Sequence, residues 1–246
     1  MFVSTEYLTF HYGVDEKIAR YFVDREPPAG NLYWHEKLLY LRPSAGYIFI
    51  PLVVDLLFKS GIAREDLLGD EYITTMEQTG HISALEEVKK ISAADAIMQC
   101  SDLVKDNCKS KDWYEDVMAY MAGEHNYITQ LASPFKALHR GDMFLFSLCA
   151  LHFPKEKEKQ IVEQWFALIT TLLLHDDAED VQADLKTGDE NAFLEHGFNP
   201  SNIAMAEDLV RKNMEIIALL NKTMATTLGN HFNNLVMKPK QLLTTN

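Results

Sequence analysis

Residues 155–187 contain no proline or glycine, and their apolar residues recur with the spacing of an α-helix. At 100° per residue, one side of such a helix collects large apolar side chains. These are Val162, Trp165, Phe166, Ile169, Leu172 and Leu173. Gly188 follows directly, and glycine readily takes the left-handed conformation that ends a helix. The pattern predicts that 155–187 forms the longest helix of the chain, with this stripe facing the core.

Helical periodicity also dominates the rest of the chain, and no run of alternating β-branched residues between turn residues indicates a strand. The expected fold class is therefore all-α. Further helices are expected over 15–24, 32–41, 44–60, 83–106, 111–131, 133–152 and 200–236. Ser83 and Glu86 have the spacing of a capping box that would start one of these helices. Pro51 should kink its helix, Gly229 should interrupt the last one, and 62–80 should be irregular.

Composition limits the class of protein and its partners. The 246 residues contain no linker rich in Pro, Gly or Ser, which predicts one domain over 1–246. The 36 acidic and 23 basic residues give a formal net charge of -13, which disfavours nucleic acid as a partner. The longest apolar runs, near 47–58 and 167–174, are shorter than the roughly 20 residues of a membrane-spanning helix. No integral membrane segment is expected.

The N-terminus lacks the basic and apolar regions of a signal peptide, which indicates a cytoplasmic protein. The three cysteines, Cys100, Cys108 and Cys149, are odd in number and widely spaced among apolar residues. This pattern is typical of buried thiols and not of a disulfide framework or a zinc site.

A row of carboxylates is the main candidate for a functional site. Asp176, Asp180 and Asp184 recur every four residues, so they lie along one side of the long predicted helix. If the helix continues at the same rotation per residue, these three acids lie on the same side as the apolar stripe and face the core. Buried carboxylates need a partner cation, and Mg²⁺ is the natural one for a ligand set made only of oxygen atoms. The alternative is that the helix has reached solvent by Asp176 and that the acids are a hydrated surface.

This segment resembles the second metal-binding motif of class I terpenoid synthases. The matching residues are Asp176, Asp177, Asp180 and Asp184, followed by Lys186, Gly188, Asp189 and Asn191. Asp176, Asp177 and Asp180 also fit the DDxxD motif of isoprenyl diphosphate synthases, which share that fold. The resemblance implies a multi-helix bundle around a central apolar cavity, in which two or three Mg²⁺ ions bind a prenyl diphosphate. Metal ions and basic residues would then draw off the diphosphate group.

The resemblance also implies a second acidic motif upstream and basic residues that bind the diphosphate. No DDxxD occurs at the expected upstream distance, where Asp55 is the only acid and thus a candidate metal ligand. The C-terminal Arg-Tyr pair of the family is also missing. Arg140, Lys186 and Arg211 are the candidate diphosphate-binding residues by chemical type.

Three hypotheses of function follow from the sequence. The first is a Mg²⁺-dependent transferase or lyase of class I isoprenoid chemistry that acts on a prenyl diphosphate, with Asp176, Asp180 and Asp184 as metal ligands and Asp177 as a supporting acid. The second is a non-catalytic protein of the same fold that binds a prenyl or diphosphate ligand or a protein partner. The third is a helical interaction module whose acids are surface charge. Homodimer formation is left open by the sequence.

Overall fold

The computed structural model describes residues 3–26, 28–32, 48–195 and 197–245, and all regular structure in these ranges is helical. The all-α class is therefore confirmed. In chain order the helices are α1 (Thr5–Tyr12), α2 (Glu16–Asp24), α4 (Phe49–Lys59), α5 (Arg64–Leu67), α6 (Asp70–Glu87), α7 (Ala93–Val104), α8 (Lys111–Met121), α9 (Tyr127–Leu131), η2 (Lys136–Ala150), α10 (Lys155–Thr187), α11 (Pro200–Ala218), α12 (Lys222–Leu235) and α13 (Met237–Thr245). The predicted helix over 32–41 lies almost entirely outside the described residues.

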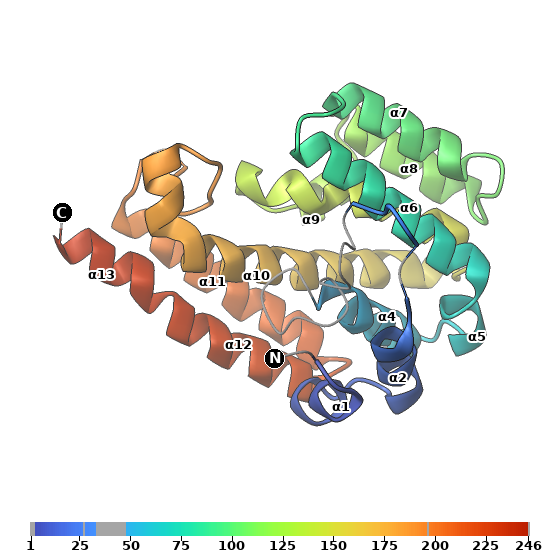
Figure 1. Cartoon of the computed structure of the whole chain (residues 1–246), viewed down its shortest axis with the longest axis horizontal. Helices are drawn as coiled ribbons and strands as arrows, with labels where there is room; N and C mark the ends of the chain where they lie inside the picture. The colour runs from blue at the N-terminus through green and yellow to red at the C-terminus, as the bar shows by residue number, and fades with distance from the viewer. Residues whose placement is uncertain (1–2, 27, 33–47, 196, 246) are drawn as a thin grey trace.

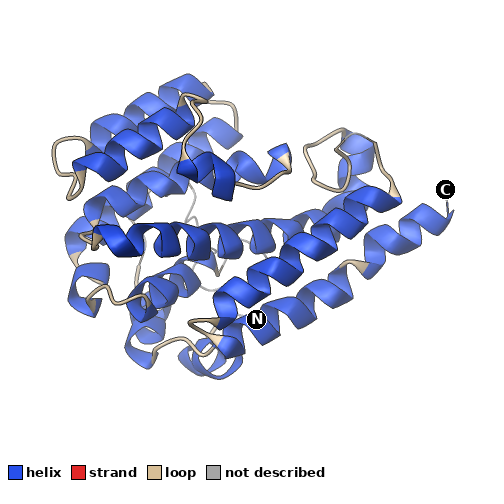
Figure 2. Cartoon of the chain, turned by 180° about the vertical axis from the view of Figure 1, so that it is seen from behind, coloured by secondary structure: helices blue, strands red, loops and turns tan. Residues whose placement is uncertain are grey.

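The long helix α10 runs through the middle of the molecule (Figure 1). It packs against α11 and α12 on one side and against α4 and η2 on the others, and α6 covers η2. The view from behind shows the same arrangement, with α10 between the α11–α12 pair and the α6–α8 group (Figure 2). Aromatic contacts join the layers, since Trp165 of α10 meets Phe49 of α4 edge to face at a ring-centroid distance of 6.1 Å. The core is thus built around α10.

Several predicted helix ends are confirmed by their caps. Gly188 ends α10 in the left-handed conformation, with φ 80°. Asp15 caps the N-terminus of α2 by accepting hydrogen bonds from Lys17 N and Ile18 N. Asn199 does the same for α11, which begins at Pro200, where the missing N–H costs nothing.

Other predicted boundaries were wrong. Much of 62–80, expected to be irregular, belongs to α5 and α6, and the expected helix over 83–106 is divided between α6 and α7. The capping box lies at Ser92 and Asp95, not at Ser83, which is buried inside α6. The described part of α4 begins at Phe49, so Pro51 lies in its first turn, where a proline breaks no helical hydrogen bond.

The C-terminal part also differs from the predicted helices. The helix over 111–131 is interrupted between α8 and α9, and the last helix is interrupted at 219–221 and not at Gly229. Residues 136–150, expected to be α-helical, form the 3₁₀ helix η2. Its three-residue repeat aligns a buried row consisting of Leu138, Gly141, Phe144 and Ser147.

Gly141 is a point of close contact between η2 and α10. A Cβ atom at this position would lie 2.8 Å from Cγ1 of Ile169 and 3.4 Å from Leu173. Gly141→Ala should therefore lower the free energy of unfolding by about 1 to 3 kcal/mol, because the added methyl group overpacks a close interface. Urea denaturation followed by circular dichroism measures the change.

The matched test of this packing is the double variant Gly141→Ala/Ile169→Ala. Removing the Ile169 side chain opens the space that the new methyl group needs, so the two losses of stability should not add. Additive losses would show that the Gly141 side of η2 does not press on Ile169.

Among the described residues, none of the helices combines the length and the apolar character needed to cross a membrane.

Candidate functional site

The carboxylates at the C-terminal end of α10 do not share one environment. Asp177 is buried, with 2% of its side chain exposed. Asp176 is half-exposed, Asp184 is partly buried and Asp180 is exposed. The prediction that Asp176, Asp180 and Asp184 face the core was therefore wrong for Asp180, and the acid that enters the core is Asp177.

The burial of α10 itself explains the difference. Gln164, Thr170 and Thr171, which lie on the side of the helix opposite the apolar stripe, are buried, since α11 covers them. Asn213 of α11 donates hydrogen bonds to the hydroxyls of Thr170 and Thr171, at 2.9 and 3.1 Å. A helix that is buried on almost every side has no single core-facing stripe. The direction of the apolar stripe at 162–173 could therefore not predict which acids of 176–184 are buried.

Arg140 of η2 lies among the acids Asp176, Asp177 and Glu87, which together form the acidic cluster. Its guanidinium donates to the carboxylate of Asp177 at 2.7 Å, to that of Asp176 at 3.4 Å and to the carbonyl of Ala137 at 2.7 Å. Burial lowers the pKa of Arg140, but Asp177, Asp176 and Glu87 raise it by more, so the net shift is upward. Arg140 thus stays charged and joins η2 to α10.

Glu87 brings a third helix into this cluster. It is the last residue of α6, it is exposed, and its charge acts on Arg140. Glu87 was not selected from the sequence, because the residues around Glu86 were expected to start a helix, whereas they end one. The packing of α6 on η2 brings this acid to the same arginine that α10 contacts.

Asn191 fastens the loop after α10 to the helix. Its side-chain amide donates to the backbone carbonyl of Asp177 at 2.7 Å and to the carboxylate of Asp184 at 2.8 Å. The next residue, Ala192, donates its backbone N–H to the Asp177 carboxylate at 2.7 Å. Asp177, Asp184 and Asn191 therefore have partners within the protein. The segment that follows Asp184 in the motif folds back onto α10 through Asn191 and Ala192.

The negative charges of Asp176 and Asp180 are not fully balanced by the contacts of Arg140 and Asn191. Burial raises the pKa of Asp176 to about 6, since the opposing effect of Arg140 is smaller and the neighbouring Asp177 and Asp180 repel a further negative charge. Asp180 forms no ion pair with the part of the chain that the structure describes. A cation placed here would relieve this repulsion.

Asp55, the candidate ligand upstream, lies in a different network. It is fully buried in α4, and it accepts hydrogen bonds from the backbone N–H of Asp15 at 2.8 Å and from the side chain of Asn221 at 2.9 Å. Lys59, one turn further along α4, forms an ion pair with it. None of these partners is one of the acids of α10.

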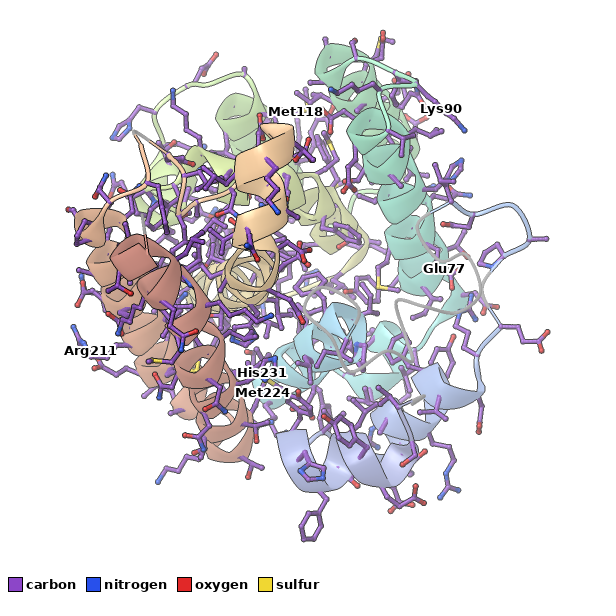
Figure 3. All side chains as sticks on the ribbon, turned by 60° about the vertical axis from the view of Figure 1, so that its left-hand side comes forward. Glu77, Lys90, Met118, Arg211, Met224 and His231 are labelled. Carbon is purple, nitrogen blue, oxygen red and sulfur yellow. The ribbon has the colours of Figure 1, made fainter. Side chains whose placement is uncertain are left out.

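The other two candidate basic residues have different surroundings from Arg140. Lys186 is exposed on the last turn of α10. Arg211 lies on α11, where its guanidinium pairs with Asp208 at 2.6 Å and with Glu215 at 2.7 Å. It lies across the molecule from Glu77 of α6 (Figure 3). Of the three candidates, Arg140 is the one that forms ion pairs with these carboxylates in the described part of the chain.

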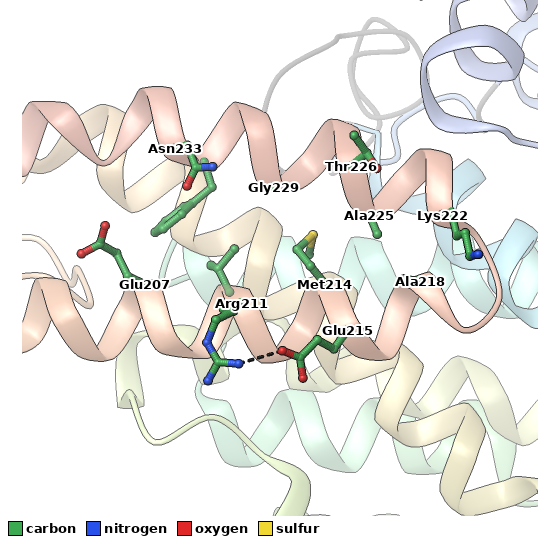
Figure 4. Close-up of a pocket in the computed structure, with 12 residues that line it drawn as sticks. Glu207, Arg211, Met214, Glu215, Ala218, Lys222, Ala225, Thr226, Gly229 and Asn233 are labelled. Atoms are coloured by element: carbon green, nitrogen blue, oxygen red, sulfur yellow. Dashed lines mark hydrogen bonds and ion pairs between the residues drawn. The ribbon is translucent and has the colours of Figure 1, made fainter.

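Arg211 borders a groove of about 560 Å³ between α11 and α12 (Figure 4). Met214 and Gly229 approach each other across this groove, and a Cβ atom on Gly229 would lie 3.3 Å from Cγ of Met214. A smaller pocket of about 240 Å³ lies nearer the acidic cluster, between the start of η2 and the loop that contains Asp189 and Asn191. The larger hollow is thus not the one beside the acids.

The side chains at the end of α10 that could ligate a metal are carboxylates, whose oxygen atoms are the donors that hard cations prefer. In the conformation described, no group of three or more Asp, Glu, His or Cys side chains within the described ranges encloses a metal site. Mg²⁺ is commonly held by one or two carboxylates together with waters and substrate phosphates, and Asp176 and Asp180 can supply the carboxylates.

Compared with known proteins, the chain matches no family model, no curated protein and no solved structure.

Proposed function

We propose that the chain binds a Mg²⁺–diphosphate group at the end of α10 and acts in class I isoprenoid chemistry on a prenyl diphosphate. The observation that carries the proposal is the negative charge at Asp176 and Asp180 beside Arg140. Mg²⁺ would bind the two carboxylates, with Asp184 next along the same side of the helix, and Arg140 would contact a diphosphate oxygen. The isoprenoid synthase fold is part of this proposal.

Glu87 takes the place of Asp55 as the opposing acid in this proposal. It comes from α6, across η2 from α10, and its charge already acts on Arg140. Asp55 has its carboxylate oxygens engaged by Asp15, Lys59 and Asn221. In the proposed site, acids from two helices flank one arginine, and a diphosphate bound with Mg²⁺ would lie between them.

The test is calorimetric titration of inorganic diphosphate into the folded chain with and without Mg²⁺. Wild type should bind diphosphate only when Mg²⁺ is present. Asp180→Asn should weaken binding by about 10- to 100-fold, because a ligating carboxylate is removed. Glu179→Gln is the matched control, since Glu179 is also exposed on α10 but pairs with Lys238 at 3.7 Å. No Mg²⁺-dependent binding by wild type would reject the site.

A second candidate function is a non-catalytic protein that keeps the ligand site. It is favoured by the structural partners of Asp177, Asp184 and Asn191, which would hold the end of α10 together without any ligand. Incubation with geranyl and farnesyl diphosphates separates the two candidates. Release of inorganic diphosphate by wild type and not by Asp180→Asn supports the enzyme, and binding without release supports the non-catalytic protein.

A further inference from the structure

Two of the three cysteines, far apart in the sequence, meet in the folded chain. Cys108 lies in the connection between α7 and α8, and Cys149 lies near the end of η2. The backbone N–H of Lys109, next to Cys108, donates to the carbonyl of Cys149 at 2.8 Å. This contact brings the two cysteines next to each other, and each thiol shifts the pKa of the other. The sequence predicted separate buried thiols, whereas the tertiary structure brings Cys108 and Cys149 together as a pair.

The two members of the pair differ in exposure. Cys149 is fully buried, whereas Cys108 is only partly buried and can be reached from solvent. Cys108 also lies just before the N-terminus of α8, where Ser110 caps the helix, and its thiol contacts the carbonyl of Ser110 at 2.9 Å. A cysteine in such a position is the one that a solvent-borne reagent meets first.

The surroundings also favour the thiolate at Cys108. Its pKa is lowered to about 7, mainly because the Cys149 thiol donates a hydrogen bond to it, with smaller contributions from the backbone at Ser110 and Tyr114. The hydrogen bond to Cys108 and burial raise the pKa of Cys149. Cys100 is a contrast within the same chain, since burial alone raises its pKa to about 12. Cys108 is thus the nucleophilic thiol and Cys149 its protonated neighbour.

We propose that Cys108 and Cys149 form a reversible intramolecular disulfide when the protein meets a hydroperoxide. The Cys108 thiolate attacks the peroxide, a sulfur–oxygen bond forms, the oxygen–oxygen bond breaks, and the leaving hydroxide or alkoxide takes up a proton. The sulfur of Cys149 then attacks the sulfenic acid, the sulfur–sulfur bond forms, and water leaves with the thiol proton. With hydrogen peroxide, two thiols lose two electrons and the peroxide becomes two waters. A thiol reductant reverses the change.

The disulfide would join the connection between α7 and α8 covalently to the end of η2. It would close a loop that contains α8, α9 and nearly all of η2. The acidic cluster around Arg140 lies outside the residues that react, so the thiol chemistry can be tested without reference to the proposed diphosphate site.

The experiment treats folded wild type with hydrogen peroxide and then blocks the remaining thiols with N-ethylmaleimide. Intact-mass measurement should show the loss of two hydrogen atoms, non-reducing peptide mapping should show a Cys108–Cys149 peptide, and dithiothreitol should restore both thiols. Cys100→Ser should behave as wild type, since Cys100 is fully buried and takes no part.

Two variants test the roles within the pair. In Cys149→Ser the reaction should stop at the sulfenic acid of Cys108, which dimedone traps. Cys108→Ser should lose the reaction with hydrogen peroxide. The inference is overturned if folded wild type gives no Cys108–Cys149 peptide, if Cys108 passes directly to sulfinic acid, or if the disulfide forms between two molecules. The wild-type peptide map decides the matter even if a variant does not fold.

Discussion

Asp177→Ala should lower the free energy of unfolding by about 3 to 5 kcal/mol, because it breaks a buried ion pair and leaves its partners without a counterpart. Of its two ion pairs, Arg140 would keep only the longer one to Asp176, and the backbone N–H of Ala192 would lose its acceptor. Equilibrium urea denaturation is the measurement. The loop that follows α10 should also exchange its amide hydrogens faster, since Ala192 is one of the points that fasten it to the helix.

The controls for Asp177 separate charge from hydrogen bonding. Asp177→Asn keeps an acceptor for Ala192 and should cost less than the alanine variant. The reason is that burial raises the pKa of Asp177 despite the presence of Arg140, so a neutral side chain is tolerated here. Asp180→Ala, on the exposed side of the same helix, should change stability by about 0.5 kcal/mol or less. Equal losses for Asp177→Ala and Asp180→Ala would contradict the structural role given to Asp177.

Asp55→Ala should also cost about 3 to 5 kcal/mol of unfolding free energy, since three donors converge on this fully buried carboxylate. They are the backbone N–H of Asp15, the amide of Asn221 and the ammonium of Lys59. Asn221 also donates to the carbonyl of Tyr12, at 2.9 Å, so the network joins the N-terminal helices to α4 and α12. Thermal and urea denaturation measure the loss.

The matched control for Asp55 is Glu16→Ala, which removes an exposed ion pair with Arg20 in the same part of the chain. An exposed pair of this kind contributes about 0.2 to 1 kcal/mol, so the control should remain close to wild type. Asp55→Asn should be intermediate, because it restores one acceptor but directs its amide hydrogens at the donors. If Asp55→Ala binds Mg²⁺ and diphosphate more weakly and yet unfolds like wild type, Asp55 belongs to the ligand site and not to this network.

The sequence predicted features that depend on neighbours in the chain. Apolar spacing gave the helical class, and Gly188 marked the end of α10, because a left-handed residue stops a helix wherever the helix packs. Asp15 and Pro200 marked the starts of α2 and α11 for equally local reasons. The concentration of acids at the end of α10 could also be recognised without a structure.

Only the tertiary structure decided what those acids contact. Because α11 covers the polar side of α10, the apolar stripe did not identify its buried side: Asp177 enters the core, and Asp180, which was expected there, is exposed. The pairing of Asp177 with Arg140 joins residues on two separate helices, as does the approach of Cys108 to Cys149. A helical period fixes only the angle of a residue about its own axis, whereas burial and pairing depend on which other helices come to lie against it.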